Sequence, residues 1–124
     1  MMQHNNPSEE IEGFINFIAQ CQDIYRISYD NVGKEDKRLQ DLLHEMEFSQ
    51  NAKERNRAAT KLKNSRKLRR ENKDQVLMLE NIIMFFDEPQ HRKVLNQLRE
   101  LMGKQRKQEK MLQSERTYRP RVEE

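Results

Sequence analysis

The chain has 124 residues, enough for one domain with a modest hydrophobic core. Charged residues make up 36% of it and hydrophobic residues 34%, with only three Gly and three Pro. This composition argues against a strand-rich fold, which needs frequent Gly and Pro in its turns, and is typical of helical bundles and coiled coils.

Cysteine usage and the N-terminal sequence bear on the compartment. Cys21 is the single cysteine, so it has no partner for an internal disulfide, and a reducing compartment is favoured. The N-terminus is polar and acidic, unlike a signal peptide, and the longest apolar run, residues 82–86, is too short to cross a bilayer. We therefore expect a cytoplasmic protein without a membrane partner.

A first helix is predicted over about 7–31. Asn6 can cap its N-terminus, Pro7 suits the first helical position, and Glu9 is placed to reach back to the cap. Gly33 predicts a C-terminal cap in the left-handed conformation. Apolar residues at spacings of three and four form its core face: Ile11, Phe14, Ile15, Ile18, Cys21 and Tyr25. Further apolar residues widen this face, so we expect the helix to contact more than one neighbour: Phe17, Ile24 and Ile27.

A second helix is predicted over about 34–86. Its apolar pattern lapses after Phe48 and resumes at Ala58, but no Gly or Pro lies in the gap. A continuous helix and a helix with a kink near residue 50 are therefore both open. Pro89 disfavours helical backbone in the residue before it, which ends this element.

A third helix is predicted over about 89–116, starting at Pro89. Its predicted core face is apolar: Val94, Leu95, Leu98, Leu101 and Met102. Residues 117–124 are expected to form a flexible tail. The predicted fold class is all-α, with three long helices in an elongated antiparallel bundle or coiled-coil arrangement, and residues 1–116 as a single domain.

The sequence shows no motif with catalytic chemistry. There is no phosphate-binding P-loop, dinucleotide fingerprint or nucleophile elbow. His44 has carboxylates three residues to either side, at Asp41 and Glu47, but a di-metal bundle needs matching motifs on other helices, and none is present. We therefore predict no enzyme activity, no catalytic residue, no cofactor and no metal site.

Residues 53–74 form a strongly basic segment. It holds ten Lys and Arg against three Asp and Glu, a net charge of +7, whereas the whole chain carries +3. Five of these residues are the candidate nucleic-acid or partner-binding site: Arg66, Lys67, Arg69, Arg70 and Lys73. A cationic helix flank can neutralise phosphates along a nucleic acid. The segment contains no aromatic residue, which argues against a stacking platform for single strands.

Two other interpretations stay open. In the first, the basic side of the helix docks on acidic residues of the first helix: Glu9, Glu10, Glu12 and Asp23. In the second, the protein is a coiled-coil scaffold or adaptor that binds another protein or self-associates. The apolar run Ile82–Phe86 favours a homodimer or partner contact, because at least Met84 or Phe85 must point away from a single core.

Three segments resemble short uncharacterised proteins of phages and mobile elements of Firmicutes: DLLHEMEFSQ, SRKLRRENKD and RTYRPRVEE. The resemblance spans most of the chain and implies a role in phage biology or in countering host defence. Small helical proteins of that origin are similar in size and setting to anti-CRISPR inhibitors, which often occlude a nucleic-acid site on a Cas nuclease, so by this analogy the implied partner is a nucleic acid or a ribonucleoprotein such as a Cas nuclease. The segments carry no motif with known chemistry, and the basic character differs from that of acidic DNA mimics.

Overall fold

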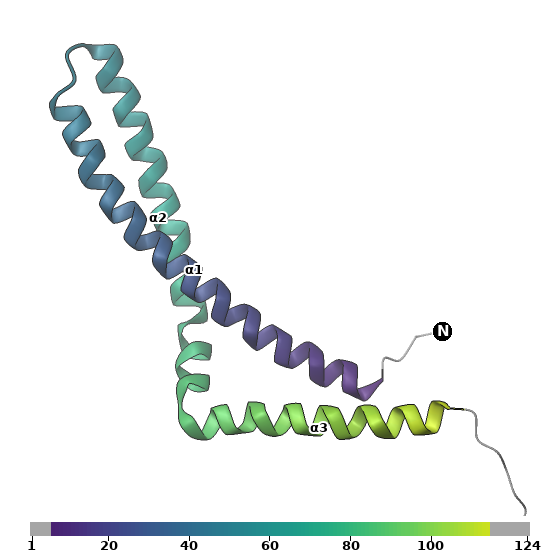
Figure 1. The fold of residues 1–124 in the computed structure, drawn as a ribbon. Coiled ribbons are helices and arrows are strands. Elements are labelled where there is room, and N and C mark those ends of the chain that lie inside the picture. Colours follow the sequence, from purple (N-terminus) through teal and green to yellow (C-terminus); the bar gives the residue numbers. More distant parts are fainter. Residues whose placement is uncertain (1–5, 115–124) are drawn as a thin grey trace, which may run out of the picture.

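The computed structural model describes residues 6–114, which form three helices joined by short connections (Figure 1). These are α1 (Pro7–Glu47), α2 (Ala52–Asp87) and α3 (Pro89–Gln113), and the described residues contain no strand. The predicted all-α bundle is therefore confirmed. The predicted tail, 117–124, lies outside the described residues.

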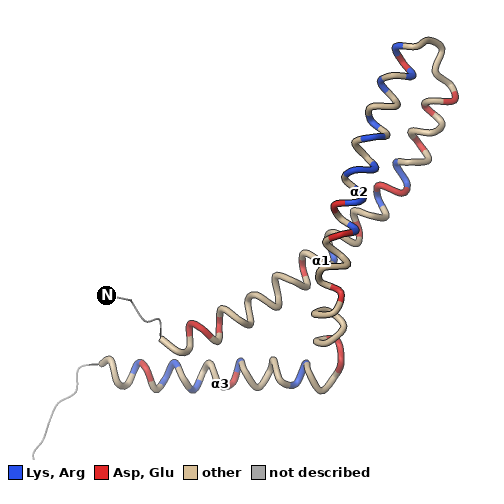
Figure 2. Tube along the Cα trace, turned by 180° about the vertical axis from the view of Figure 1, so that it is seen from behind, with Lys and Arg blue, Asp and Glu red and all other residues tan. Residues whose placement is uncertain are grey.

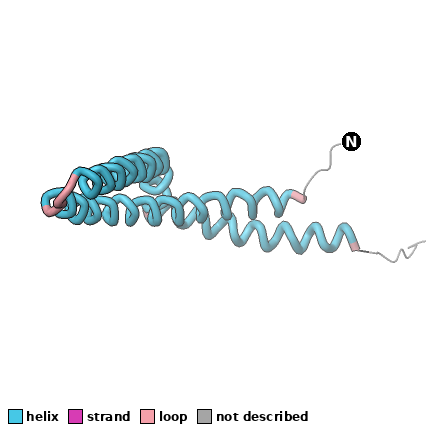
Figure 3. The backbone as a smooth tube through the Cα atoms, turned by 90° about the horizontal axis from the view of Figure 1, so that it is seen from above, coloured by secondary structure: helices cyan, strands magenta, loops and turns pink. Residues whose placement is uncertain are grey.

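α1 is the central element of the bundle. At 41 residues it is about 60 Å long, given a rise of ~1.5 Å per residue. Its C-terminal half pairs antiparallel with α2, and its N-terminal half lies beside α3, which returns along it (Figures 1 and 3). The expectation that the first helix contacts more than one neighbour is confirmed. The arm formed by α1 and α2 extends beyond α3, so the molecule is elongated (Figure 1).

The packed face of α2 follows a seven-residue repeat. Its buried and half-buried positions include 58, 62, 65, 69, 72, 76, 79, 83 and 86, which alternate in spacing between four and three. This is the repeat of a left-handed coiled coil, in which one narrow stripe faces the partner helix. Within the basic segment this stripe comprises Ala58 and Ser65, which are buried, and Leu62, which is half-buried, whereas Ala59 is exposed.

The first reversal of the chain does not lie where it was predicted. α1 continues through Gly33 to Glu47, and no described glycine has a positive φ, so the predicted cap at Gly33 is wrong. Glycine inside a helix costs about 1 kcal/mol relative to alanine. Contacts of α1 with α2 on both sides of Gly33 offset this cost: Asn31 with Asn72, and Asp36 with Arg69.

The predicted helix 34–86 is divided by the reversal at residues 48–51, so neither a continuous nor a merely kinked helix is correct. Local hydrogen bonds end α1 and start α2 without Gly or Pro. The Ser49 hydroxyl donates to the Glu45 carbonyl at 2.7 Å. Asn51 Oδ1 accepts from the Glu54 N–H, and the Glu54 carboxylate accepts from the Gln50 N–H, each at 2.9 Å.

The other two helix boundaries follow the prediction more closely. Glu88 is extended, with φ −69° and ψ 134°, and Pro89 begins α3 as expected. Asn6 is the N-cap residue of α1, but its side chain makes no capping hydrogen bond. Instead, Asn6 Oδ1 accepts from Gln113 Nε2 at 2.8 Å, which joins the start of α1 to the end of α3.

The hydrophobic core is small. Among the described residues no large side chain is fully buried, and the buried hydrophobic residues are Ile15, Ile18, Cys21, Leu42, Ala58, Val76, Leu79 and Leu95. On the predicted core face of the third helix, Leu95 is buried and Leu98 and Met102 are half-buried. Val94 and Leu101 are exposed instead, since α3 faces α1 along a narrower stripe than predicted.

Candidate nucleic-acid interface

The basic segment, residues 53–74, forms the half of α2 that begins at the tip of the helical arm. Figure 2 shows Lys and Arg concentrated along this half, whereas the half of α2 near α3 is almost without them. The direction in which each cation points is set by the packing of α2 on α1.

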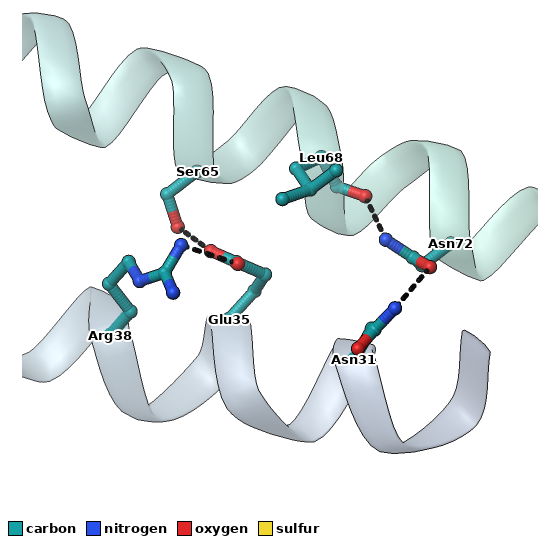
Figure 4. Close-up of polar contacts among 6 residues, drawn as sticks. All are labelled: Asn31, Glu35, Arg38, Ser65, Leu68 and Asn72. Carbon is teal, nitrogen blue, oxygen red and sulfur yellow. Dashed lines mark hydrogen bonds and ion pairs between the residues drawn. The ribbon is translucent and has the colours of Figure 1, made fainter. Parts of the chain in front are cut away.

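A layer of polar contacts fixes that packing (Figure 4). Glu35 is buried, and its carboxylate accepts from the Ser65 hydroxyl at 2.5 Å and from Arg38 Nη1 at 2.7 Å. One turn away, Asn31 Nδ2 donates to Asn72 Oδ1 at 3.2 Å. Buried polar pairs of this kind specify register in coiled coils, because a shifted register leaves them without partners. The layer therefore determines which side of the basic segment faces solvent.

Arg69 is the one predicted site residue that faces α1. It is half-buried, and its Nε lies 2.6 Å from Asp36 Oδ1. Nearer the tip, Lys61 Nζ lies 3.3 Å from Glu45 Oε1. These are the two ion pairs that join α2 to α1 among the described residues. We therefore assign Arg69 a role in holding the two helices together.

The basic side of α2 does not dock on the acidic start of α1, so that alternative is wrong. Glu12 pairs with Arg106 of α3, and Asp23 pairs with Arg26 of its own helix at 3.5 Å. The antiparallel pairing of α1 and α2 places the basic segment beside the other end of α1 (Figure 2).

The remaining four predicted site residues are exposed: Arg66, Lys67, Arg70 and Lys73. None of them makes an ion pair or a side-chain hydrogen bond with another residue in 6–114. Lys63 is likewise exposed and has no ion-pair partner within 6–114. It lies on the same side of the helix, three residues before Arg66 and seven before Arg70. We call these five residues the basic flank: Lys63, Arg66, Lys67, Arg70 and Lys73. The same spacing rule that grouped the others could have added Lys63.

Arg66 and Arg70 form a ridge between two shallow depressions. The depression between α1 and α2 is lined by these two arginines and by Glu35, Asp36, Leu39, Ser65, Arg69 and Lys73. The one on the outer side of α2 is lined by the same arginines and by Ala59, Leu62, Lys63, Asn64 and Lys67. An extended polyanion lying along α2 can therefore contact the ridge from either side.

Tyr29 of α1 is a neighbour of the flank that sequence reasoning missed. It is exposed and lines a depression together with Gly33 and Lys73. Tyr29 and Lys73 are 44 positions apart, so only the pairing of α1 with α2 brings them to one depression. No local sequence signal could have found it.

Two other features, a metal site and a membrane-spanning helix, are absent from the described residues. No group of three or more His, Cys, Asp or Glu among them could hold a metal ion, and His44 Nδ1 lies 3.9 Å from Glu47 on an exposed surface. No described helix is long and apolar enough to cross a membrane.

The chain matches no protein-family model, no curated protein and no solved structure. The resemblance to proteins of Firmicutes phages and mobile elements therefore stays a prediction.

Proposed function

We propose that the protein binds the phosphate backbone of a nucleic acid, either free or within a ribonucleoprotein, through the basic flank. The observation that carries this proposal is the contrast within one helix. Arg69 and Lys61 pair with carboxylates of α1, whereas the five cations of the flank have no ion-pair partner in the described chain.

The flank has the dimensions to contact several phosphates at once. From Lys63 to Lys73 it extends about 15 Å along the helix axis. Duplex DNA presents one negative charge per ~1.7 Å of its axis, so about nine phosphates lie within that length. Five like charges at spacings of three and four repel one another, and a polyanion relieves that repulsion.

The chemistry of the flank favours backbone contacts over base recognition. Lys and Arg side chains bind phosphates without regard to sequence, and these contacts position a protein on its nucleic acid. The flank holds no aromatic side chain, and the exposed Tyr29 beside it offers one ring, whereas a single-strand platform stacks successive bases on several rings, so a duplex is favoured over a single strand. In the anti-CRISPR setting that the resemblance implies, the same flank would contact the nucleic acid of a ribonucleoprotein such as a Cas nuclease.

The test replaces four cations of the flank with glutamine, which keeps helix propensity: Lys63, Arg66, Lys67 and Arg70. Arg69 is retained because it pairs with Asp36. The matched control replaces four exposed lysines of α3: Lys93, Lys104, Lys107 and Lys110. Both variants lose four positive charges, from two Lys and two Arg in the flank and from four Lys in the control, so a difference in salt slope between them reports the position of the lost charge.

Binding of labelled DNA and RNA duplexes of about 20 base pairs is measured by fluorescence anisotropy over a salt series. The flank variant should bind at least tenfold more weakly, and its salt slope should be shallower by up to about 3.6, given ~0.9 per lost phosphate contact on DNA. The control should keep the slope of the unmodified protein. Equal losses in both variants, or no duplex binding by the unmodified protein, would overturn the proposal.

A further inference from the structure

The half of α2 near α3 exposes a run of large apolar side chains. Leu77 is 55% exposed, Met78 74%, Met84 62% and Phe85 50%. With Asn81 at their centre, they form one surface, which we call the α2 apolar face. It lies opposite the stripe that packs on α1, since buried Val76 and Leu79 and half-buried Ile83 and Phe86 alternate with it along the helix.

This face is almost free of charge. Residues 75–86 contain a single charged residue, Glu80, in a chain whose charged fraction is 36% (Figure 2). The expectation from sequence that Met84 or Phe85 points away from the core holds for both of them. A side chain of this size exposes ~200 Å² when free, so the four expose on the order of 500 Å² per copy. This lies in the upper part of the range of about 300–600 Å² for the largest apolar patch on a monomer, and patches of that size are often functional.

Joining two α2 apolar faces removes on the order of 1,000 Å², the lower bound for a specific interface. Such an association covers the α2 apolar face.

We propose that two copies of this chain pair through the α2 apolar face, with their α2 helices antiparallel and Asn81 on the two-fold axis. The face is symmetric about Asn81. Leu77 and Phe85 lie four residues to either side of it, and Met78 and Met84 lie three residues to either side. In an isologous contact each residue meets its counterpart across the axis, so Leu77 packs on Phe85 and Met78 on Met84 of the second copy.

The lack of charge on the α2 apolar face permits a second copy of this chain to bind there. An isologous contact brings like charges together wherever the surface is charged, so this uncharged face is the part of α2 that tolerates it. Phe85 is also held in place before association, because its ring stacks on His91 with centroids 3.7 Å apart. A fixed aromatic anchor loses little conformational entropy on binding.

The same register places Asp74 of one copy opposite Glu88 of the other at each end of the face. Like charges at a rim weaken association, and salt screens them. Added salt should therefore strengthen this pairing, whereas it weakens contacts with phosphate. The salt response distinguishes this proposal from the proposed nucleic-acid binding, and neither depends on the other.

The first test is the mass in solution, measured by light scattering after size exclusion at tens of micromolar protein. The unmodified chain should have twice its mass of 15.1 kDa. Met84→Lys should have the monomer mass and Met111→Lys the dimer mass, although Met111, on α3, is similarly exposed at 51%. Circular dichroism should show both variants helical, because neither side chain belongs to the core.

The second test determines the register by cross-linking, in a background with Cys21→Ala. Asn81→Cys should form a covalent dimer with a short bismaleimide, since the two residues face each other at the axis. Asn64→Cys, an equally neutral change at another exposed position of α2, should not, because the two copies would hold it about 50 Å apart.

A monomeric unmodified chain would overturn the proposal and leave the face to a different protein. A dimer that survives Met84→Lys, or a cross-link at residue 64 together with residue 81, would overturn the interface or its antiparallel register.

Discussion

Glu109, near the end of α3, caps the start of α1 across 101 positions of the sequence. Its carboxylate accepts from the Ser8 N–H at 2.9 Å and from the Ser8 hydroxyl at 2.5 Å, and both residues are buried. The first N–H groups of a helix have no partner within it, and the helix dipole makes that end positive. A carboxylate from another helix satisfies both needs, so it attaches α3 to α1 where the two helices meet.

Replacing Glu109 with glutamine should lower the melting temperature and loosen the end of α3. The amide oxygen can still accept one hydrogen bond, but the negative charge at the helix N-terminus is lost. Hydrogen exchange should increase in residues 105–113 more than in α2. Glu100→Gln, at an exposed position of the same helix, serves as the control and should change neither measurement. Equal exchange in both variants would contradict this role of Glu109.

The stability that Glu109 contributes should depend on pH in the acidic range. Burial raises the pKa of Glu109. Hydrogen bonds from the Ser8 hydroxyl and N–H, a hydrogen bond from Gln105 and the positive charge of Arg106 lower it, and together they outweigh burial, so the pKa lies below its ordinary 4.5. A group whose pKa is lowered by folding stabilises the folded state fully above its unfolded pKa, and this contribution is lost as the pH falls through the folded pKa. The difference in melting temperature between the unmodified chain and Glu109→Gln should be constant above about pH 5.5 and shrink on acidification. A difference in melting temperature that grows as the pH falls would contradict a lowered pKa of Glu109.

Ser65→Ala should destabilise the α1–α2 pair by about 1–2 kcal/mol, because it leaves the buried Glu35 carboxylate with one donor fewer. Denaturant unfolding followed by circular dichroism measures the loss. Thr60→Ala, at an exposed position of the same helix, should change stability by less than about 0.5 kcal/mol. The double variant Glu35→Leu with Ser65→Ala should recover part of the loss, since an apolar pair can replace a buried polar one.

Leu79→Ala should destabilise by about 2–4 kcal/mol, because Leu79 is 8% exposed and its truncation leaves a cavity between α1 and α2. Leu101→Ala removes the same atoms from a side chain that is 46% exposed and should cost less than about 1 kcal/mol. Chemical denaturation of both variants at one protein concentration provides the comparison. Similar losses at the two positions would mean that the packed face of the helices has been misassigned.

Asn51→Ala should destabilise by about 1 kcal/mol, because the Glu54 N–H loses its capping acceptor at the start of α2. Asn64→Ala, at an exposed position within the same helix, is the control and should be neutral or slightly stabilising, given the higher helix propensity of alanine. Urea midpoints at constant slope measure both effects. No loss at Asn51 would show that the reversal is held by the pairing of the helices rather than by its local hydrogen bonds.

Local sequence determined the helical content, the boundary at Pro89 and the position of the basic segment. These features depend on residue spacing, on the fixed backbone of proline and on the lack of Gly and Pro within the helices, all of which act over a few residues. The apolar pattern that resumes at Ala58 coincides with the start of the packed stripe of α2, because one helical period determines which residues share a face.

Only the tertiary structure decided where the chain reverses and which cations are available to a partner. The sequence predicted an end of the first helix at Gly33, but the helix continues to Glu47, and α1 pairs with α2 on both sides of Gly33. Arg69 and Arg70 are neighbours with the same charge and propensity, yet Asp36 pairs with one while the other faces solvent. Residues distant in sequence decide where α1 ends and which cations are paired, just as Glu109 of α3 caps α1 at Ser8. The register between helices is a long-range property, so no local pattern contains it.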